Sequence, residues 1–138
     1  MRKSCGAVVY RIKGDVEFLL VQFRGQHGWG FPKSDTMFEL PEPKAAVRNV
    51  RDKTGLERQL IDGFSHSFSY RHGARKVTLY LGAVDPDATV LLGKNYQHYR
   101  WRSYQEAKAT LAHQNSLRAL ERAKDYLATH VLGLHAEQ

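Results

Sequence analysis

The sequence is short of cysteine and of long apolar runs. It contains one cysteine, Cys5, so no disulfide can form within the chain. A lone thiol suits a reducing compartment, and we therefore expect a cytoplasmic protein. No apolar run approaches the length of a membrane span, so we expect no membrane partner. We expect Cys5 to be a small buried residue of the first strand rather than a nucleophile.

Several common functional signatures are also missing. The seven histidines are scattered, and no two stand at a spacing that would pair them as metal ligands on one strand or helix. There is no nucleotide P-loop, no Ser-His-Asp signature and no cysteine-based zinc pattern. Acidic residues are fewer than basic ones, 14 against 21, which gives a net charge of +7. A basic surface favours polyanions such as nucleotides, nucleic acid or acidic proteins.

What the sequence does contain is a series of strand patterns. A length of 138 residues with 42% hydrophobic residues is enough for one domain with an ordinary core. β-Branched and aromatic runs bounded by turn residues predict the strands. We expect them at 3–12, 16–23, 58–71 (bent at Gly63), 75–84, 88–93 and 97–102. The first two should form a hairpin through the turn at 13–15.

Helical patterns cover three other segments. Apolar residues at spacings of three and four predict helices at 43–54, 104–111 and 117–131. Gly55 is expected to end the first. Ser103 and Glu106 form a capping box for the second, and Ser116 is the expected N-cap of the third. Strands, then a helix, strands and two helices predict an α+β fold in which helices flank a sheet.

Residues 30–56, GFPKSDTMFELPEPKAAVRNVRDKTGL, resemble the Nudix box, G-x5-E-x7-R-E-U-x-E-E-x-G-U, where U is a bulky aliphatic residue. The frame fits without a gap on Arg48, Val50, Gly55 and Leu56. Two further parts of the chain are similar to the asymmetric diadenosine tetraphosphate hydrolases, a subgroup of the Nudix (MutT-like) enzymes. They are the opening SCGAVVYR with EFLLVQ, and YQHYRWRSYQEA with NSLRALERAKDYL. The resemblance implies a single Nudix domain over 1–138, an α/β/α sandwich with a mixed β-sheet, with its C-terminal helices at about 104–131.

In that family the box glutamates bind Mg²⁺ or Mn²⁺, which bridge pyrophosphate oxygens and activate water. Here most of those positions are changed. The opening glycine falls on Ser34, and the glutamates fall on Leu40, Asn49, Asp52 and Lys53, with a further one on Asn95. The resemblance therefore assigns Arg48, Asn49 and Asp52 to the catalytic positions. Asp52 and Glu39, one position from the first box glutamate, are the remaining candidate metal ligands.

The resemblance also suggests how a nucleotide would be held. Lys33 and Lys76 match basic positions near the polyphosphate, and Tyr70 matches an aromatic residue that stacks on adenine. Lys53 could bind phosphate where the metal would have been, since lysine acts as a point charge for phosphate.

Three functions remain open from the sequence. The first is a Nudix-fold protein that binds a nucleotide or dinucleoside polyphosphate with weak or lost hydrolase activity. The second is an active Mg²⁺- or Mn²⁺-dependent Nudix hydrolase that uses a rearranged carboxylate site. The third is a module that binds RNA or a protein partner through its basic surface.

Overall fold

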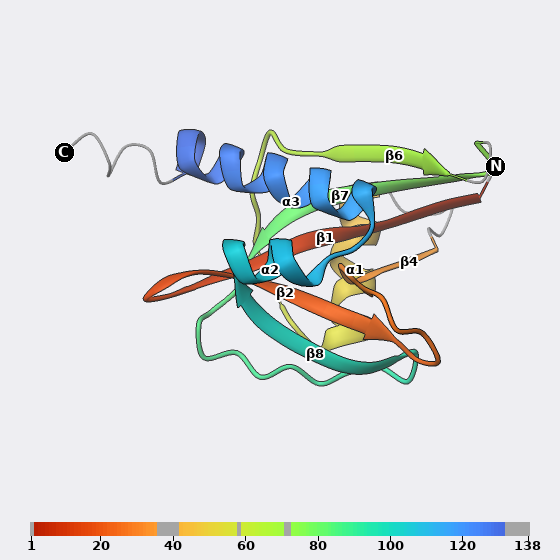
Figure 1. Ribbon diagram of the computed structural model, residues 1–138, viewed down its shortest axis with the longest axis horizontal. Coiled ribbons are helices and arrows are strands. Elements are labelled where there is room, and N and C mark those ends of the chain that lie inside the picture. The colour runs from red at the N-terminus through yellow and green to blue at the C-terminus, as the bar shows by residue number, and fades with distance from the viewer. Residues whose placement is uncertain (1, 36–41, 58, 71–72, 132–138) are drawn as a thin grey trace.

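The computed structural model describes residues 2–35, 42–57, 59–70 and 73–131. They form a mixed sheet with helices on both faces (Figure 1). The strands are β1 (Arg2–Lys13), β2 (Asp15–Phe23), β3 (Trp29–Gly30), β4 (Lys33–Asp35), β5 (Gln59–Leu60), β6 (His66–Tyr70), β7 (Arg75–Ala83) and β8 (Tyr96–Ser103). The helices are α1 (Glu42–Thr54), α2 (Tyr104–Thr110) and α3 (Gln114–Tyr126), which continues as a π-helical turn, η1 (Leu127–Val131). No helix in the described ranges is long and apolar enough to cross a membrane.

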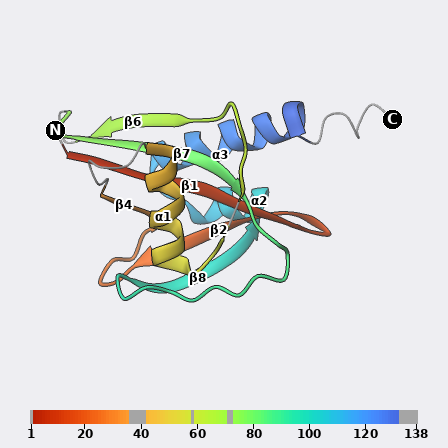
Figure 2. The same cartoon turned by 180° about the vertical axis from the view of Figure 1, so that it is seen from behind.

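Strand β1 lies at the centre of the sheet. It pairs in parallel with β7 and antiparallel with β2 and β4. Its side chains alternate between two cores, as the period of a strand requires. Val8 and Tyr10 belong to the core under α2 and α3, whereas Ala7 and Val9 belong to the core on the α1 side. Seen from behind, α1 crosses the sheet on the face opposite α2 and α3 (Figure 2).

This architecture confirms the expected α+β fold with a mixed sheet. Helix α1 occupies the predicted segment, and Gly55 follows its last residue at φ 72°, the left-handed conformation that commonly ends a helix. The capping box of Ser103 and Glu106 is present at the start of α2. Cys5 is fully buried in β1, as expected.

One expected strand is wrong, and two expected elements have different bounds. Residues 88–93 form a loop rather than a strand, because their backbone bonds the end of α1: the amides of Leu91 and Gly93 donate to the carbonyls of Thr54 and Lys53. The expected strand at 58–71 is divided into β5 and β6, with Gly63 between them at φ 88°. Helix α3 begins before Ser116, with His113 as its N-cap.

Candidate functional site

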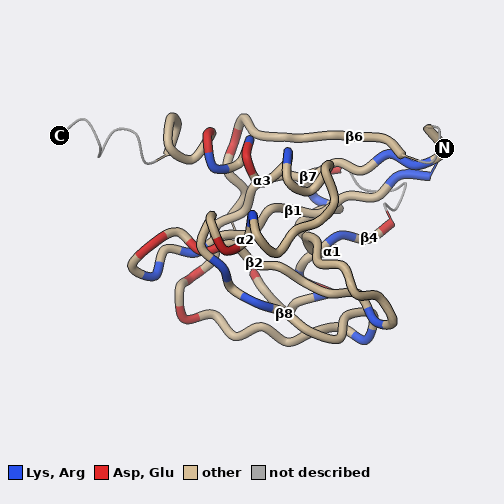
Figure 3. Tube along the Cα trace, in the orientation of Figure 1, with Lys and Arg blue, Asp and Glu red and all other residues tan. Residues whose placement is uncertain are grey.

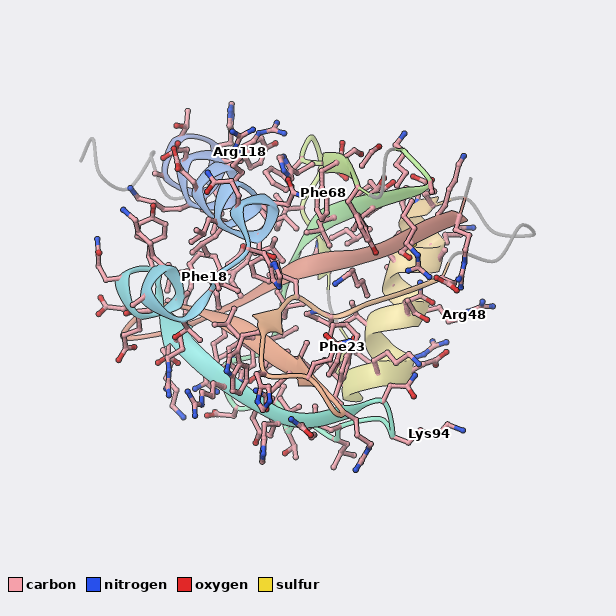
Figure 4. The ribbon with its side chains drawn as sticks, turned by 45° about the vertical axis from the view of Figure 1, so that its right-hand side comes forward. Phe18, Phe23, Arg48, Phe68, Lys94 and Arg118 are labelled. Carbon is pink, nitrogen blue, oxygen red and sulfur yellow. The ribbon has the colours of Figure 1, made fainter. Side chains whose placement is uncertain are left out.

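A cavity of about 570 Å³ lies where β4, the start of β7, the end of β2 and the loop before β8 meet. Figure 4 shows Phe23 at the end of β2 and Lys94 in the loop that precedes β8. The described residues that line the cavity come from distant parts of the chain: Ser4, Phe23, Arg24, Gln26, Lys33, Ser34, Asp35, Lys53, Tyr70, Arg75, Lys94, Asn95 and Tyr96.

The lining is strongly basic. It includes Arg24, Lys33, Lys53, Arg75 and Lys94, and its one described carboxylate is Asp35. Figure 3 shows basic residues at the adjoining ends of β1 and β7, and a basic residue followed by an acidic one on β4. Asp35 is already paired, because Arg2 donates to it at 2.6 Å and the Ser4 hydroxyl donates at 3.1 Å. Burial opposes ionisation of Asp35, but these two hydrogen bonds and the charge of Arg2 lower its pKa. The cavity is therefore suited to a polyanion.

Tyr96 holds the backbone of Lys33 in place. The Tyr96 hydroxyl accepts a hydrogen bond from the Lys33 backbone amide at 3.0 Å and donates one to the Lys33 carbonyl at 3.1 Å. Its Nζ lies 4.8 Å from the ring centroid of Phe23. Burial, followed by the charge of Arg75, lowers the pKa of Lys33 to about 8. An anion bound nearby would favour the charged ammonium and raise this pKa again.

Tyr70 and Arg75 face each other across the β6–β7 pair. The Arg75 guanidinium donates to the Tyr70 hydroxyl at 3.4 Å, and both side chains line the cavity. The Tyr70 ring also packs against Phe68, with 6.4 Å between ring centroids. This pair places a flat aromatic side chain beside a cation, a combination that can hold a base and a phosphate of the same ligand.

Asn49 connects α1 to the sheet. It is 5% exposed, and its amide nitrogen donates to the carbonyls of Cys5 at 3.1 Å and Ser34 at 3.2 Å. These acceptors fix the orientation of the amide, because the reversed arrangement would bring three oxygens together without a proton between them. The position that the family gives to a glutamate therefore presents hydrogen-bond donors.

The other residues of the box helix lie in different surroundings. Lys53 lines the cavity. The Asp52 side chain is 59% exposed, 3.9 Å from the Arg51 guanidinium, and it is not among the lining residues. Arg48 projects from α1 (Figure 4). It is half-buried and makes no ion pair with another described residue.

The remaining sequence candidates divide in the same way. The structure brings Lys33, Tyr70 and Lys53 together at one cavity. Lys76 lies next to Arg75 on β7, but only Arg75 is among the lining residues, since neighbouring side chains on a strand point to opposite faces. Glu39 lies outside the described residues.

Sequence reasoning missed Arg75 and the contributions from the end of β2 and the loop before β8. The missed lining residues include Phe23, Arg24, Lys94 and Tyr96. No motif marks them, and they meet only because β2, β4 and β8 converge.

Solved structures have the same fold. The C. elegans Ap4A hydrolase, in a binary complex, superposes with a TM-score of 0.84 at 22% identity, over 91% of this chain and 98% of that one. A NUDIX hydrolase from Nitrosomonas europaea superposes with a TM-score of 0.75 at 13% identity, over 94% and 73% of the two chains. The chain therefore has the Nudix hydrolase fold, as the box frame predicted.

A likeness in sequence adds a more particular relative. The chain is 28% identical over 119 residues to the asymmetrical bis(5'-nucleosyl)-tetraphosphatase of Sus scrofa, across 76% of this chain and 81% of that protein. This confirms the predicted resemblance to diadenosine tetraphosphate hydrolases. No protein-family model matches the chain.

The described residues do not fit the divalent metal that the fold implies. Mg²⁺ requires hard oxygen ligands, usually carboxylates and water. Asn49 instead directs N–H groups toward the Ser34 and Cys5 carbonyls, and Lys53, on the same helix, brings an ammonium to the cavity. Within the described ranges no group of three or more His, Cys, Asp or Glu could hold a metal ion.

Proposed function

We propose that this protein binds a nucleoside polyphosphate, of the diadenosine tetraphosphate type, and that its hydrolase activity is weak or lost. The observation that carries the proposal is the combination of a five-cation cavity with a box helix whose Asn49 and Lys53 positions present an amide and an ammonium. The first feature supports binding of the polyphosphate. The second removes the carboxylates by which the family assembles its catalytic metals.

The phosphates would lie against Lys33, Lys53 and Arg75. Each supplies a positive group to the same cavity, and arginine can donate two parallel hydrogen bonds to one phosphate. A base would stack on Tyr70, a contact worth about 1–3 kcal/mol in other nucleotide complexes. The basic lining would also attract polyphosphate over longer distances, so affinity should fall as salt rises.

The described lining has no free base that could activate water for hydrolysis. A water molecule must be deprotonated and directed at phosphorus, which needs a base within hydrogen-bond reach. Asp35 is the described carboxylate of the cavity, and Arg2 and Ser4 already occupy its oxygens. Lys33, Lys53 and Arg75 can bind the phosphates but do not replace a metal-bound hydroxide.

The proposal is tested by measuring binding and turnover on the same preparation. Calorimetry with diadenosine tetraphosphate, ATP and inorganic triphosphate should detect binding that Lys33→Ala combined with Arg75→Ala greatly weakens. Lys44→Ala is the matched control, because Lys44 is an exposed cation on α1 outside the cavity lining.

Product analysis with Mg²⁺ or Mn²⁺ present tests the catalytic part. We expect turnover far below the roughly 1–10³ per second of ordinary enzymes. Turnover within that range would show an active hydrolase with a rearranged site. Salt-sensitive binding to single-stranded RNA, tighter than to any nucleotide in the panel, would instead favour a nucleic-acid module.

A further inference from the structure

Ser34 is a lining residue on β4, and its carbonyl accepts a hydrogen bond from the Asn49 amide nitrogen at 3.2 Å. The carbonyl of Cys5 accepts from the same nitrogen. Two carbonyl oxygens converging on one point make a partial negative site that either a cation or an N–H group can satisfy. Here the Asn49 amide supplies that positive group from within the chain. The carbonyls therefore do not need a metal ion.

Lys53 adds a positive charge on the side of α1 that carries Asn49. It follows Asn49 by four residues, so the two side chains lie on the same face of the helix. Lys53 lines the cavity, whereas the neighbouring Asp52 carboxylate is exposed and lies near Arg51. A divalent cation that enters with a nucleotide would be repelled by the Lys53 ammonium. Asp35, the described carboxylate of the cavity, does not offset this repulsion because it is paired with Arg2.

The charge of the ligand depends on the metal. A free nucleoside triphosphate carries roughly four negative charges near neutral pH, and a bound Mg²⁺ removes about two of them. Five cations line the cavity, so the metal-free form is the better electrostatic match.

We infer that this cavity takes its polyphosphate ligand free of divalent cation, and that Mg²⁺ competes with the protein for the ligand. The inference rests on the proposed function, since it concerns the same cavity, and it specifies the chemical form of the ligand. Lys33, Lys53 and Arg75 take the neutralising role that a metal has in a metal-dependent phosphate site. Asn49 keeps the backbone carbonyls satisfied when no metal is present.

Calorimetric titration with ATP and with inorganic triphosphate tests this, once in EDTA and once in excess Mg²⁺ at equal ionic strength. We expect binding in EDTA to be tighter by on the order of tenfold, because the ligand keeps its full charge. Equal or tighter binding with Mg²⁺ would overturn the inference while the proposed function stood. Absence of binding in both buffers would instead refute the proposed function.

A second measurement asks about the metal directly. Mn²⁺ titration followed by electron paramagnetic resonance covers the whole chain, residues 36–41 included. We expect no Mn²⁺ binding at concentrations below about 1 mM, weaker than the sensor-type metal sites of proteins. Tight Mn²⁺ binding to the wild-type chain would overturn the inference whatever the calorimetry showed.

Variants complete the test. Lys53→Gln removes one charge at a partly exposed position and should shrink the difference between EDTA and Mg²⁺. Asn49→Glu combined with Lys53→Glu should bind Mn²⁺ and reverse the sign of the Mg²⁺ effect. If Lys53→Gln leaves the difference unchanged, Lys53 does not discriminate against the metal and the inference fails. Circular dichroism confirms that each variant is folded before titration.

Discussion

Replacing Asn49 by alanine removes two hydrogen bonds that join the middle of α1 to backbone carbonyls of β1 and β4, together with a longer contact to the Cys5 sulfur at 3.5 Å. Both bonds have ordinary lengths, and the side chain is 5% exposed, so water cannot easily replace it. A hydrogen bond contributes roughly 0.5–1.5 kcal/mol net, so losing two should cost about 1–3 kcal/mol. Against a total stability of about 5–15 kcal/mol, that is a large fraction and easily measured.

Urea unfolding followed by circular dichroism gives the free energy of unfolding. The matched control is Asp52→Ala, because Asp52 lies on the same helix with its side chain 59% exposed. That control should stay within about 0.5 kcal/mol of wild type. If Asn49→Ala were as stable as Asp52→Ala, the amide would not be the link that the structure shows.

Asn49→Asp sharpens the prediction, since the side chain keeps its size. An ionised carboxylate would face the carbonyls of Cys5 and Ser34, so this variant should be less stable than Asn49→Ala at pH 7 without metal. Those carbonyls and burial would raise the pKa of the new carboxyl. The penalty is therefore fully present well above that pKa, and it shrinks as the pH falls toward the value of about 4 for the unfolded chain. Stability equal to wild type at pH 7 would refute the reasoning.

Three other predictions follow from the cavity. Polyphosphate affinity should fall as the pH rises through 8 toward 10, because Lys33, with its pKa lowered to about 8, must then take up a proton on binding. Calorimetry in buffers of different ionisation heat should detect that proton uptake. The uptake should be absent in Lys33→Met. Tyr96→Phe leaves the amide and carbonyl of Lys33 without their hydroxyl partner, so it should cost about 1–3 kcal/mol in urea unfolding and weaken ligand binding. Gly6→Ala would press a methyl group against Pro32 and within 2.7 Å of the Lys33 Cα, which should lower the free energy of unfolding by about 1–3 kcal/mol. In Gly30→Ala the nearest atom to the new methyl group lies at 4.0 Å, so this control should keep its stability. Thermal unfolding of the two variants makes the comparison.

Local patterns were sufficient for much of the fold. The hairpin of β1 and β2, the span of α1 and its end at Gly55 follow from periodicity and turn residues over short distances. The error at 88–93 has a non-local cause. The last carbonyls of a helix lack partners within the helix. Here the amides of Leu91 and Gly93 bond the carbonyls at the end of α1, which competes with strand pairing.

The cavity shows a similar division. Lys53 could be proposed because it occupies a position of the box frame, and Lys33 and Tyr70 could be proposed because they match family positions outside that frame. Arg75 could have been found from the expected strands at 58–71 and 75–84, because antiparallel pairing of the two places it opposite Tyr70. Lys94 could not, since its place depends on the loop before β8 returning to the end of α1.

The structure also separates what keeps the box helix in place from what the family's chemistry requires. Ala45, Ala46 and Val50 are fully buried, and Gly55 with Leu56 ends the helix, so apolar packing and backbone conformation hold α1 without a metal. A buried glutamate at position 49 would add an anion beside two carbonyl oxygens, an arrangement that is stable only with a cation between them. Asparagine resolves that conflict within the chain. Asparagine at this position therefore joins the helix to the sheet without a metal ion.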